Sequence, residues 1–209
     1  MSASHKGGSS PARKRPESSR ATAVSERSTC QAIPYRDRQV EALQRISLAV
    51  SATLDLTEVL RRIIREITSL FAAHSASVVL HNNATNEAEL LTSYGGDGAL
   101  RRLCYPLPGS LTGWVAAHRR PLRIPCLTRH EWPAVWRLAE QLGVRPTQLS
   151  VLLVPLWARG TVAGSLEVIW EGPHTITDRE EQLLEAIAAQ AVIAIDNARL
   201  YQDAQAEIA

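Results

Sequence analysis

The sequence has few aromatic side chains and no long hydrophobic run. Phe and Met each occur once, and aromatic residues make up 5% of the 209 positions, although the apolar content of 45% is enough for the core of one domain. No stretch of 18 or more apolar residues occurs, and the N-terminus is polar where a secretory signal would be apolar. These absences predict neither a membrane span nor a signal peptide, and they favour a cytoplasmic location.

Cysteine is also scarce. Cys30, Cys104 and Cys126 are an odd number at wide spacing, which makes a poor disulfide framework and suits a reducing compartment. The phosphate-binding loop of nucleotide hydrolases, the zinc-binding His-Glu-x-x-His helix and the Gly-x-Ser-x-Gly elbow are absent as well. The sequence therefore predicts a protein that is not an enzyme.

The net charge of +2 hides an asymmetry along the chain. Residues 1–38 hold eight Lys and Arg against three Asp and Glu, and the rest of the chain holds fifteen against eighteen. The first segment is rich in Ser, Pro, Gly and Ala, so we expect a disordered basic tail over 1–38 and one domain over 39–209. The tail offers a weak contact for nucleic acid, and the rest of the chain predicts no such partner.

Two helices are expected before the first strand. In residues 38–53 the apolar positions form a narrow stripe, which is typical of a helix that meets another helix; its members are Val40, Leu43, Ile46 and Val50. The next helix opens at Leu56, with Thr57 as its expected cap. Its broad apolar face predicts that it lies flat on a sheet.

Six strand patterns follow, interrupted by short helices. We expect strands over 77–81, 89–94, 103–107, 121–124, 149–157 and 161–170, and helices over 111–118 and 128–142. Ser110 caps the first of these helices, and Thr177 with Glu180 forms a capping box for the closing helix. Strands joined as hairpins, with helices gathered to one side, predict an α+β fold: a mostly antiparallel six-stranded sheet with helices packed on one face.

The closing helix is apolar nearly all round, which implies burial against two partners. One partner is the sheet, and the other could be a second subunit. Together with the stripe of residues 38–53, this predicts a homodimer that pairs through a seam on the closing helix, formed by Leu183, Ala186, Ile193 and Leu200.

The order of these elements and several local patterns resemble the GAF family of sensory domains, whose fold is PAS-like. The resemblance covers residues 40–203. Its motifs are Leu54-Asp55-Leu56-Thr57-Glu58-Val59-Leu60, Gly109-Ser110-Leu111-Thr112-Gly113-Trp114-Val115-Ala116, Val154-Pro155-Leu156, Gly160-Thr161-Val162-Ala163-Gly164 and the ending Ala194-Ile195-Asp196-Asn197-Ala198-Arg199-Leu200-Tyr201. It implies a sensory module in signal transduction that binds a small molecule and acts on a downstream signalling protein.

The resemblance also implies a ligand pocket between the sheet and the connecting helices. The candidate lining residues are Ser110, Thr112, Cys126, His130, Trp132 and Trp136. The two tryptophans, four residues apart, either line this pocket or anchor their helix to the sheet. Cys126 and His130 have a spacing that suits a metal on a helix, but one such pair falls short of a ligand set, and no metal site is predicted.

The ligand itself stays unknown. The Asn-Lys, Phe and Asp-Glu signature of members that bind cyclic nucleotides is absent, and Cys104 and Cys126 lack the following histidine of bilin-binding members. The motifs support neither haem nor bilin. Two alternatives stay open: a free methionine sulfoxide reductase on the same fold, which would need closely placed thiols, and a dimerisation scaffold without a ligand.

Overall fold

The computed structural model describes residue 44 and residues 55–82, 84–92, 101–142 and 146–208. Six strands form one sheet in the order β3-β2-β1-β6-β5-β4, and every neighbouring pair is antiparallel. The predicted α+β fold with an antiparallel six-stranded sheet is therefore confirmed. The strands are β1 (Ser75–Asn82), β2 (Glu87–Thr92), β3 (Arg101–Pro106), β4 (Leu122–Leu127), β5 (Leu149–Ala158) and β6 (Thr161–Glu171).

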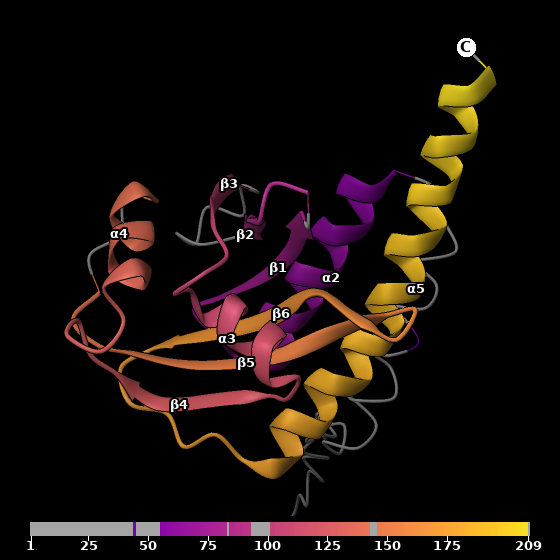
Figure 1. Ribbon diagram of the computed structural model, residues 1–209. Coiled ribbons are helices and arrows are strands. Elements are labelled where there is room, and N and C mark those ends of the chain that lie inside the picture. The colour runs from indigo at the N-terminus through magenta and orange to yellow at the C-terminus, as the bar shows by residue number, and fades with distance from the viewer. Residues whose placement is uncertain (1–43, 45–54, 83, 93–100, 143–145, 209) are drawn as a thin grey trace, which may run out of the picture. The chain divides into compact units, whose positions relative to one another are not determined.

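The two long helices cover one face of this sheet (Figure 1). Helix α2 (Leu56–Leu70) and helix α5 (Asp178–Ile208) share one apolar cluster with the strand residues beneath them, such as Leu152 and Val168. The shorter helices α3 (Leu111–His118) and α4 (Pro133–Gln141) pack with strand residues of opposite parity, such as Val151. Because side chains alternate between the faces of a strand, α3 and α4 lie over the opposite face of the sheet, so the helices are divided between the two faces and not gathered on one as expected.

Local sequence chemistry explains where three of the helices begin. Thr177 Oγ1 accepts a hydrogen bond from the Glu180 amide over 3.2 Å, and the Glu180 carboxylate accepts one from the Thr177 amide over 2.7 Å. This capping box and the Ser110 cap of α3, which accepts from the Gly113 amide over 3.0 Å, are confirmed. The prediction for α2 was wrong. Its cap is Asp55, whose carboxylate accepts from the Thr57 amide over 2.9 Å, because the carboxylate stands one residue before the first helical turn.

The central strand pair β1 and β6 comes very close at Gly164. A Cβ at this position would lie 2.0 Å from the Val79 carbonyl oxygen, so only glycine fits.

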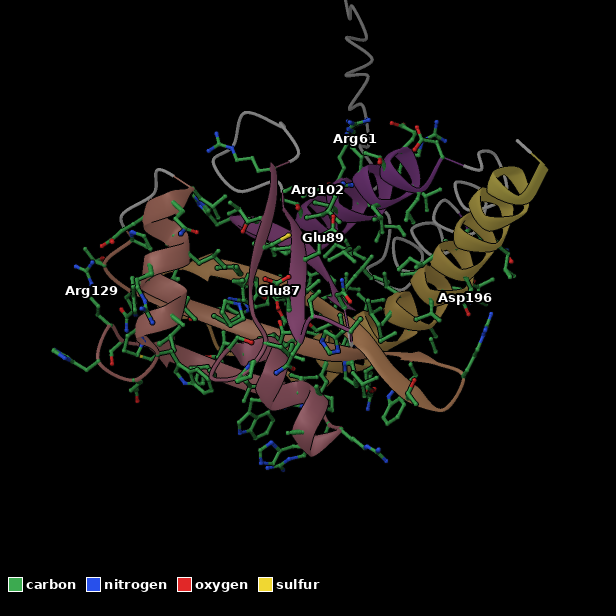
Figure 2. All side chains as sticks on the ribbon, turned by 45° about the horizontal axis from the view of Figure 1, so that its top comes forward. Arg61, Glu87, Glu89, Arg102, Arg129 and Asp196 are labelled. Atoms are coloured by element: carbon green, nitrogen blue, oxygen red, sulfur yellow. The ribbon has the colours of Figure 1, made fainter. Side chains whose placement is uncertain are left out.

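At the edge formed by β2 and β3, the Arg102 guanidinium pairs with the Glu89 carboxylate over 2.9 Å, and both residues are labelled in Figure 2. The strands β1 and β6 are therefore in close contact at the centre of the sheet, and a surface ion pair joins β2 to β3 near one edge.

Several predictions lie outside the described residues. They are the basic tail over 1–38 and the helix over 38–53, of which the structure describes Gln44 alone. No helix within the described ranges combines the length and apolar character that crossing a bilayer requires.

Candidate functional site

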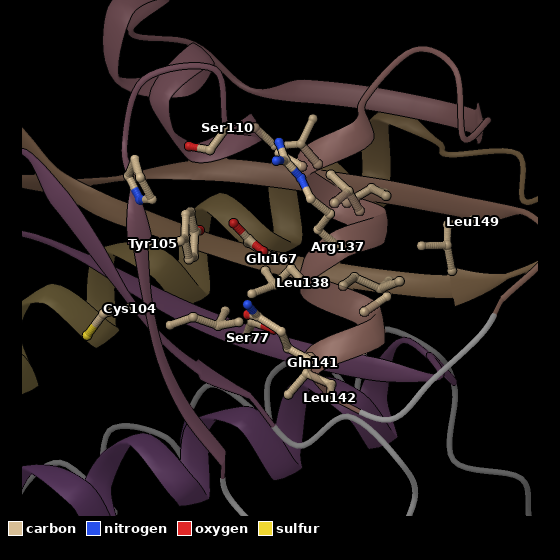
Figure 3. Close-up of a pocket in the computed structure, with 18 of the residues that line it drawn as sticks. Ser77, Cys104, Tyr105, Ser110, Arg137, Leu138, Gln141, Leu142, Leu149 and Glu167 are labelled. Carbon is tan, nitrogen blue, oxygen red and sulfur yellow. The ribbon is translucent and has the colours of Figure 1, made fainter.

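A cavity of about 350 Å³ lies on the face of the sheet covered by α3 and α4 (Figure 3). Its floor comes from four strands, with Ser77 of β1, Leu90 of β2, Val151 of β5 and Glu167 of β6. Its walls come from α4, the start of α3 and the segment that joins β3 to α3. The volume falls at the lower end of the range for small-molecule sites, which is about 300 to 1,000 Å³.

The space exists because two apolar clusters stand apart on this face. One cluster joins Trp136 of α4 to Leu149 and Leu153 of β5. The other lies over β1 and β2 and includes Val79 and Leu90, with Leu138 of α4 packed against it. Helix α4 thus spans both clusters. The strand residues between them are small or polar, and they include Ser77, Ser165 and Glu167, so they leave the volume unfilled.

Glu167 is the most unusual residue of this floor. Its side chain is only 7% exposed, and in the sheet it stands between Ser77 of β1 and Leu153 of β5. Its Oε1 accepts hydrogen bonds from the hydroxyl groups of Thr112, over 2.7 Å, and Ser165, over 3.1 Å. The hydroxyl groups of Tyr105 and Thr112 are 3.2 Å apart, so Tyr105 can donate in turn to Thr112. Polar groups from β3, α3 and β6, of which Tyr105 is half-buried and the others are buried, therefore form one network.

Burial raises the pKa of Glu167 to about 7, although the hydrogen bonds from Thr112 and Ser165 act in the opposite direction. Burial, together with the negative charge of Glu167, also raises the pKa of Tyr105. The phenol therefore keeps its proton and acts as a donor. Glu167 is thus poised to exchange a proton near neutral pH at the floor of a ligand-sized cavity.

The rim of the cavity contains exposed polar residues. Arg137 and Gln141 come from α4, and Cys104 comes from the edge strand β3. The Arg101 guanidinium donates to the carbonyl oxygen of Leu142 over 2.7 Å, which ties the end of α4 to β3. Figure 3 shows Arg137 and Glu167 on the same cavity, one from the covering helix and one from the sheet.

Two predicted pocket residues lie at this site. Ser110 is buried and lines the cavity, and its hydroxyl also donates to the carbonyl oxygen of Leu107 over 2.7 Å. Thr112 is buried behind the cavity wall, where it binds Glu167. Both residues are held by the N-terminal turn of α3. Gly113 permits this turn, since a Cβ there would lie 2.1 Å from the Leu107 carbonyl oxygen.

The other four predicted residues do not line the cavity. Cys126 and His130 are exposed, near the end of β4 and in the loop after it. Trp132 and Trp136 pack into the apolar cluster with β5, so they hold α4 on the sheet. Sequence reasoning missed Glu167, Arg137 and Tyr105. An acidic residue in a long strand of a mainly apolar hairpin was the one available signal for Glu167.

The described cysteines do not approach each other. Cys104 lies on β3 and Cys126 on β4, which are the two edge strands of the sheet. Five strand spacings, or about 24 Å, separate these edges. Within the ranges that the structure describes, no group of three His, Cys, Asp or Glu side chains could hold a metal ion. The paired thiols that the reductase alternative requires are therefore not formed by Cys104 and Cys126.

The predicted seam residues of α5 fall into two groups. Leu183 is 6% exposed and belongs to the core beneath the helix, because it faces the sheet of its own chain. Ala186 is exposed, and Ile193 and Leu200 are 51% and 55% exposed. The other predicted seam residues, Val40, Leu43, Ile46 and Val50, lie outside the described residues.

The fold and the cavity define a class: an α+β domain whose sheet carries two long helices on one face and a ligand-sized cavity on the other. The sequence model of the GAF domain family matches residues 53–196, and the chain belongs to this family. The GAF domain of a phosphoenolpyruvate-protein phosphotransferase from Coxiella burnetii superposes with a TM-score of 0.65 at 19% identity, over 80% of this chain and 98% of that one.

Two further proteins are similar to this chain. An uncharacterised sensor-like histidine kinase from Chloroflexus aurantiacus is 28% identical over 189 residues, which are 87% of this chain and 29% of the relative. The chain thus spans less than a third of that relative. The free methionine-R-sulfoxide reductase from Neisseria meningitidis, solved with its substrate, has a TM-score of 0.58 at 16% identity, over 78% of this chain and 91% of that one. At such identity the likeness concerns the fold alone.

Proposed function

We propose that this chain is a cytoplasmic sensory module that binds a small molecule in the cavity beneath α4 and passes the binding event to a signalling partner through α5. The observation that carries the proposal is Glu167, a buried acidic side chain at the floor of an otherwise largely apolar cavity. A few convergent polar groups in a concave apolar site are the general mark of ligand recognition. The sensor-like histidine kinase relative supports a signalling role.

The strands offer a physical route from the cavity to α5. Val151 lines the cavity, and the next residue of β5, Leu152, packs on the other face in the cluster that contains Leu184 and Ile187 of α5. A ligand that prefers one position of β5 and β6 would therefore also bias the packing of α5. We also propose that the exposed stripe of α5, formed by Ala186, Ile193 and Leu200, pairs with the same stripe of a second copy of the chain. A ligand that shifts the packing of α5 would then also change the helical dimer.

Occlusion of the cavity tests this proposal. Ala134 of α4 lines the cavity, and Ala134→Trp would fill part of it, whereas Ala117→Trp places the same side chain on an exposed position of α3. Circular dichroism would first establish that both variants fold. We expect native mass spectrometry of the purified chain, or thermal shifts with a panel of small metabolites, to reveal a compound that binds the wild type and Ala117→Trp but not Ala134→Trp. If no compound separates the variants in this way, ligand sensing in this cavity is refuted.

A further inference from the structure

Two side chains of opposite formal charge face the same cavity from opposite layers. Glu167 lies on the floor, in the middle of the sheet, and Arg137 lies at the rim, on α4 (Figure 3). Among the residues that the structure describes, Arg137 makes no ion pair and no hydrogen bond, and no salt bridge joins it to Glu167. The guanidinium thus keeps its planar set of N–H donors for another group.

The two oxygens of Glu167 have different roles. Oε1 accepts both protein hydrogen bonds, from Thr112 and Ser165, so the protein already satisfies it. Oε2 has no partner among the described residues, yet it is not among the buried unpaired atoms, so it opens to the cavity. Thr112 and Ser165 each donate their single hydroxyl proton to Oε1, so neither can donate to Oε2. The carboxyl group is therefore fixed with one oxygen aimed at whatever fills the space.

The rest of the cavity wall around these two groups is mainly apolar. Leu111 of α3, Leu138 of α4, Leu149 of β5 and Ile169 of β6 line it, and the whole volume is about 350 Å³. A ligand that satisfies every part of this site must be small and carry an apolar body, a basic nitrogen for Oε2 and an anionic group for Arg137. A carboxylate or another flat anion matches the fork of a guanidinium.

We propose that the cavity recognises a zwitterion of amino-acid size, and this proposal rests on the proposed ligand-binding function. The ammonium group of the ligand would bind Oε2 of Glu167, and its carboxylate would bind Arg137. The apolar part of the ligand lies against Leu111, Leu138 and Leu149. Neither charged group of the protein is then left buried without a partner, which would otherwise cost binding free energy.

This recognition moves a proton. Burial raises the pKa of Glu167 to about 7, so near neutral pH a fraction of the molecules carries the proton. The other polar groups of the network are the hydroxyl groups of Thr112, Ser165 and Tyr105, and Arg137 is the cation at the rim. An ammonium group at Oε2 favours the ionised carboxylate, so binding at pH 7 releases the proton from this fraction to solvent.

Amino acids with defined charge deletions test the proposal on the full chain. Isothermal titration calorimetry would screen the twenty common amino acids one by one, in two buffers with different ionisation enthalpies. Two analogues of the amino acid that binds most tightly would then be titrated in the same way. One is the carboxylic acid that lacks the amino group, and the other is the amine that lacks the carboxylate. Glu167→Gln and Arg137→Gln remove the two protein charges, and Arg65→Gln removes an exposed guanidinium on α2, across the sheet from the cavity.

We expect at least one amino acid with an apolar side chain to bind the wild type and Arg65→Gln equally, with proton release. Each truncated analogue, and each of the two cavity variants, should bind at least about tenfold more weakly. Equal binding to Glu167→Gln or Arg137→Gln would overturn the proposal, and so would the absence of binding by any amino acid. If no amino acid binds but a metabolite separates wild type from Ala134→Trp, the zwitterion inference fails while the sensory function stands; if nothing binds, both fail.

Discussion

The hydroxyl group of Thr112 donates a hydrogen bond to the Glu167 carboxylate over 2.7 Å, although 55 residues separate them along the chain. Thr112 lies in the first turn of α3, and Glu167 lies in the central strand β6. The bond therefore joins a connecting helix to the middle of the sheet, directly behind the cavity. It also explains how a carboxylate that is only 7% exposed is tolerated, because buried polar groups need hydrogen-bond partners.

The buried carboxyl group should make the folding stability depend on pH. The pKa of Glu167 is raised from 4.5 to about 7 in the folded chain, so between these values the folded state binds more protons than the unfolded state. The contribution of Glu167 to stability is then greatest below about pH 4.5 and is lost as pH rises through 7, by on the order of 3 kcal/mol. Glu167→Gln keeps the side-chain volume and the acceptor oxygen but removes the titration.

Urea unfolding at pH 5 and pH 8 would measure this effect. We expect the loss of stability between the two values to be smaller in Glu167→Gln by most of that amount. Glu185→Gln, which changes an exposed residue on α5, should follow the wild type. Parallel profiles for wild type and Glu167→Gln would contradict the assignment of a raised pKa to this residue.

Removal of the Thr112 hydroxyl group should raise the pKa of Glu167 further above 7. A hydrogen bond to the charged form favours ionisation, and Thr112→Val removes one of the two donors to Oε1. The substitution should also destabilise the fold at pH 8 by about 1 to 3 kcal/mol. A ¹³C NMR titration of labelled glutamate carboxyl groups would follow the shift, with Glu167→Gln to assign the signal. Thr175→Val, at an exposed loop position, should leave that signal unchanged.

The fold was largely predictable because its signals are local. The apolar run of Leu149–Ala158 and the strand pattern of Thr161–Glu171, with the turn between them, specify a hairpin from a few neighbouring residues. The turn residues Arg159 and Gly160 have φ values of 49° and 78°, and the capping box at Thr177 is equally local. The cap of α2 was predicted wrongly at Thr57, because the capping residue depends on where the first helical turn begins, and this turn places Asp55 at the cap.

The site was less predictable because burial of a strand residue depends on what covers it. In the sequence, Ser165 and Glu167 alternate with Leu166 and Val168, which is the pattern of a strand with one solvent-exposed face. Only the placement of α3 and Tyr105 over that face turns Glu167 into a buried residue. Trp132 and Trp136 were predicted as candidate lining residues, yet they pack into the apolar cluster with β5, and Arg137, next to Trp136, lines the cavity.

Gly164→Ala should destabilise the sheet by about 2 kcal/mol or more. The new Cβ would lie 2.0 Å from the Val79 carbonyl oxygen, so β1 and β6 would have to separate at their closest approach. Gly160→Ala is a matched control with φ of 78° and open space at its Cβ, and it should cost about 1 to 2 kcal/mol for its backbone conformation alone. Guanidinium unfolding of both variants would rank them, and a greater loss for Gly160→Ala would contradict the steric argument.

The exposed face of α5 gives the clearest test of the proposed dimer. Ala186, Ile193 and Leu200 recur every seven residues, so they share one narrow stripe, while Leu183 faces the core of its own chain. Ile193 is 51% exposed, so Ile193→Glu should change the stability of the protomer by no more than about 0.5 kcal/mol.

In a dimer, the same substitution would place two carboxylates in an apolar seam. We therefore expect sedimentation equilibrium to show a dimer for the wild type and for Ile193→Leu, which keeps the apolar surface. Ile193→Glu should raise the dimer dissociation constant by at least about tenfold, because burial of an unpaired charge opposes association. A wild type that stays monomeric at high concentration, or a dimer indifferent to Ile193→Glu, would contradict pairing through this stripe. Thermal unfolding of Ile193→Glu at low concentration, where only protomers exist, would separate lost pairing from lost folding.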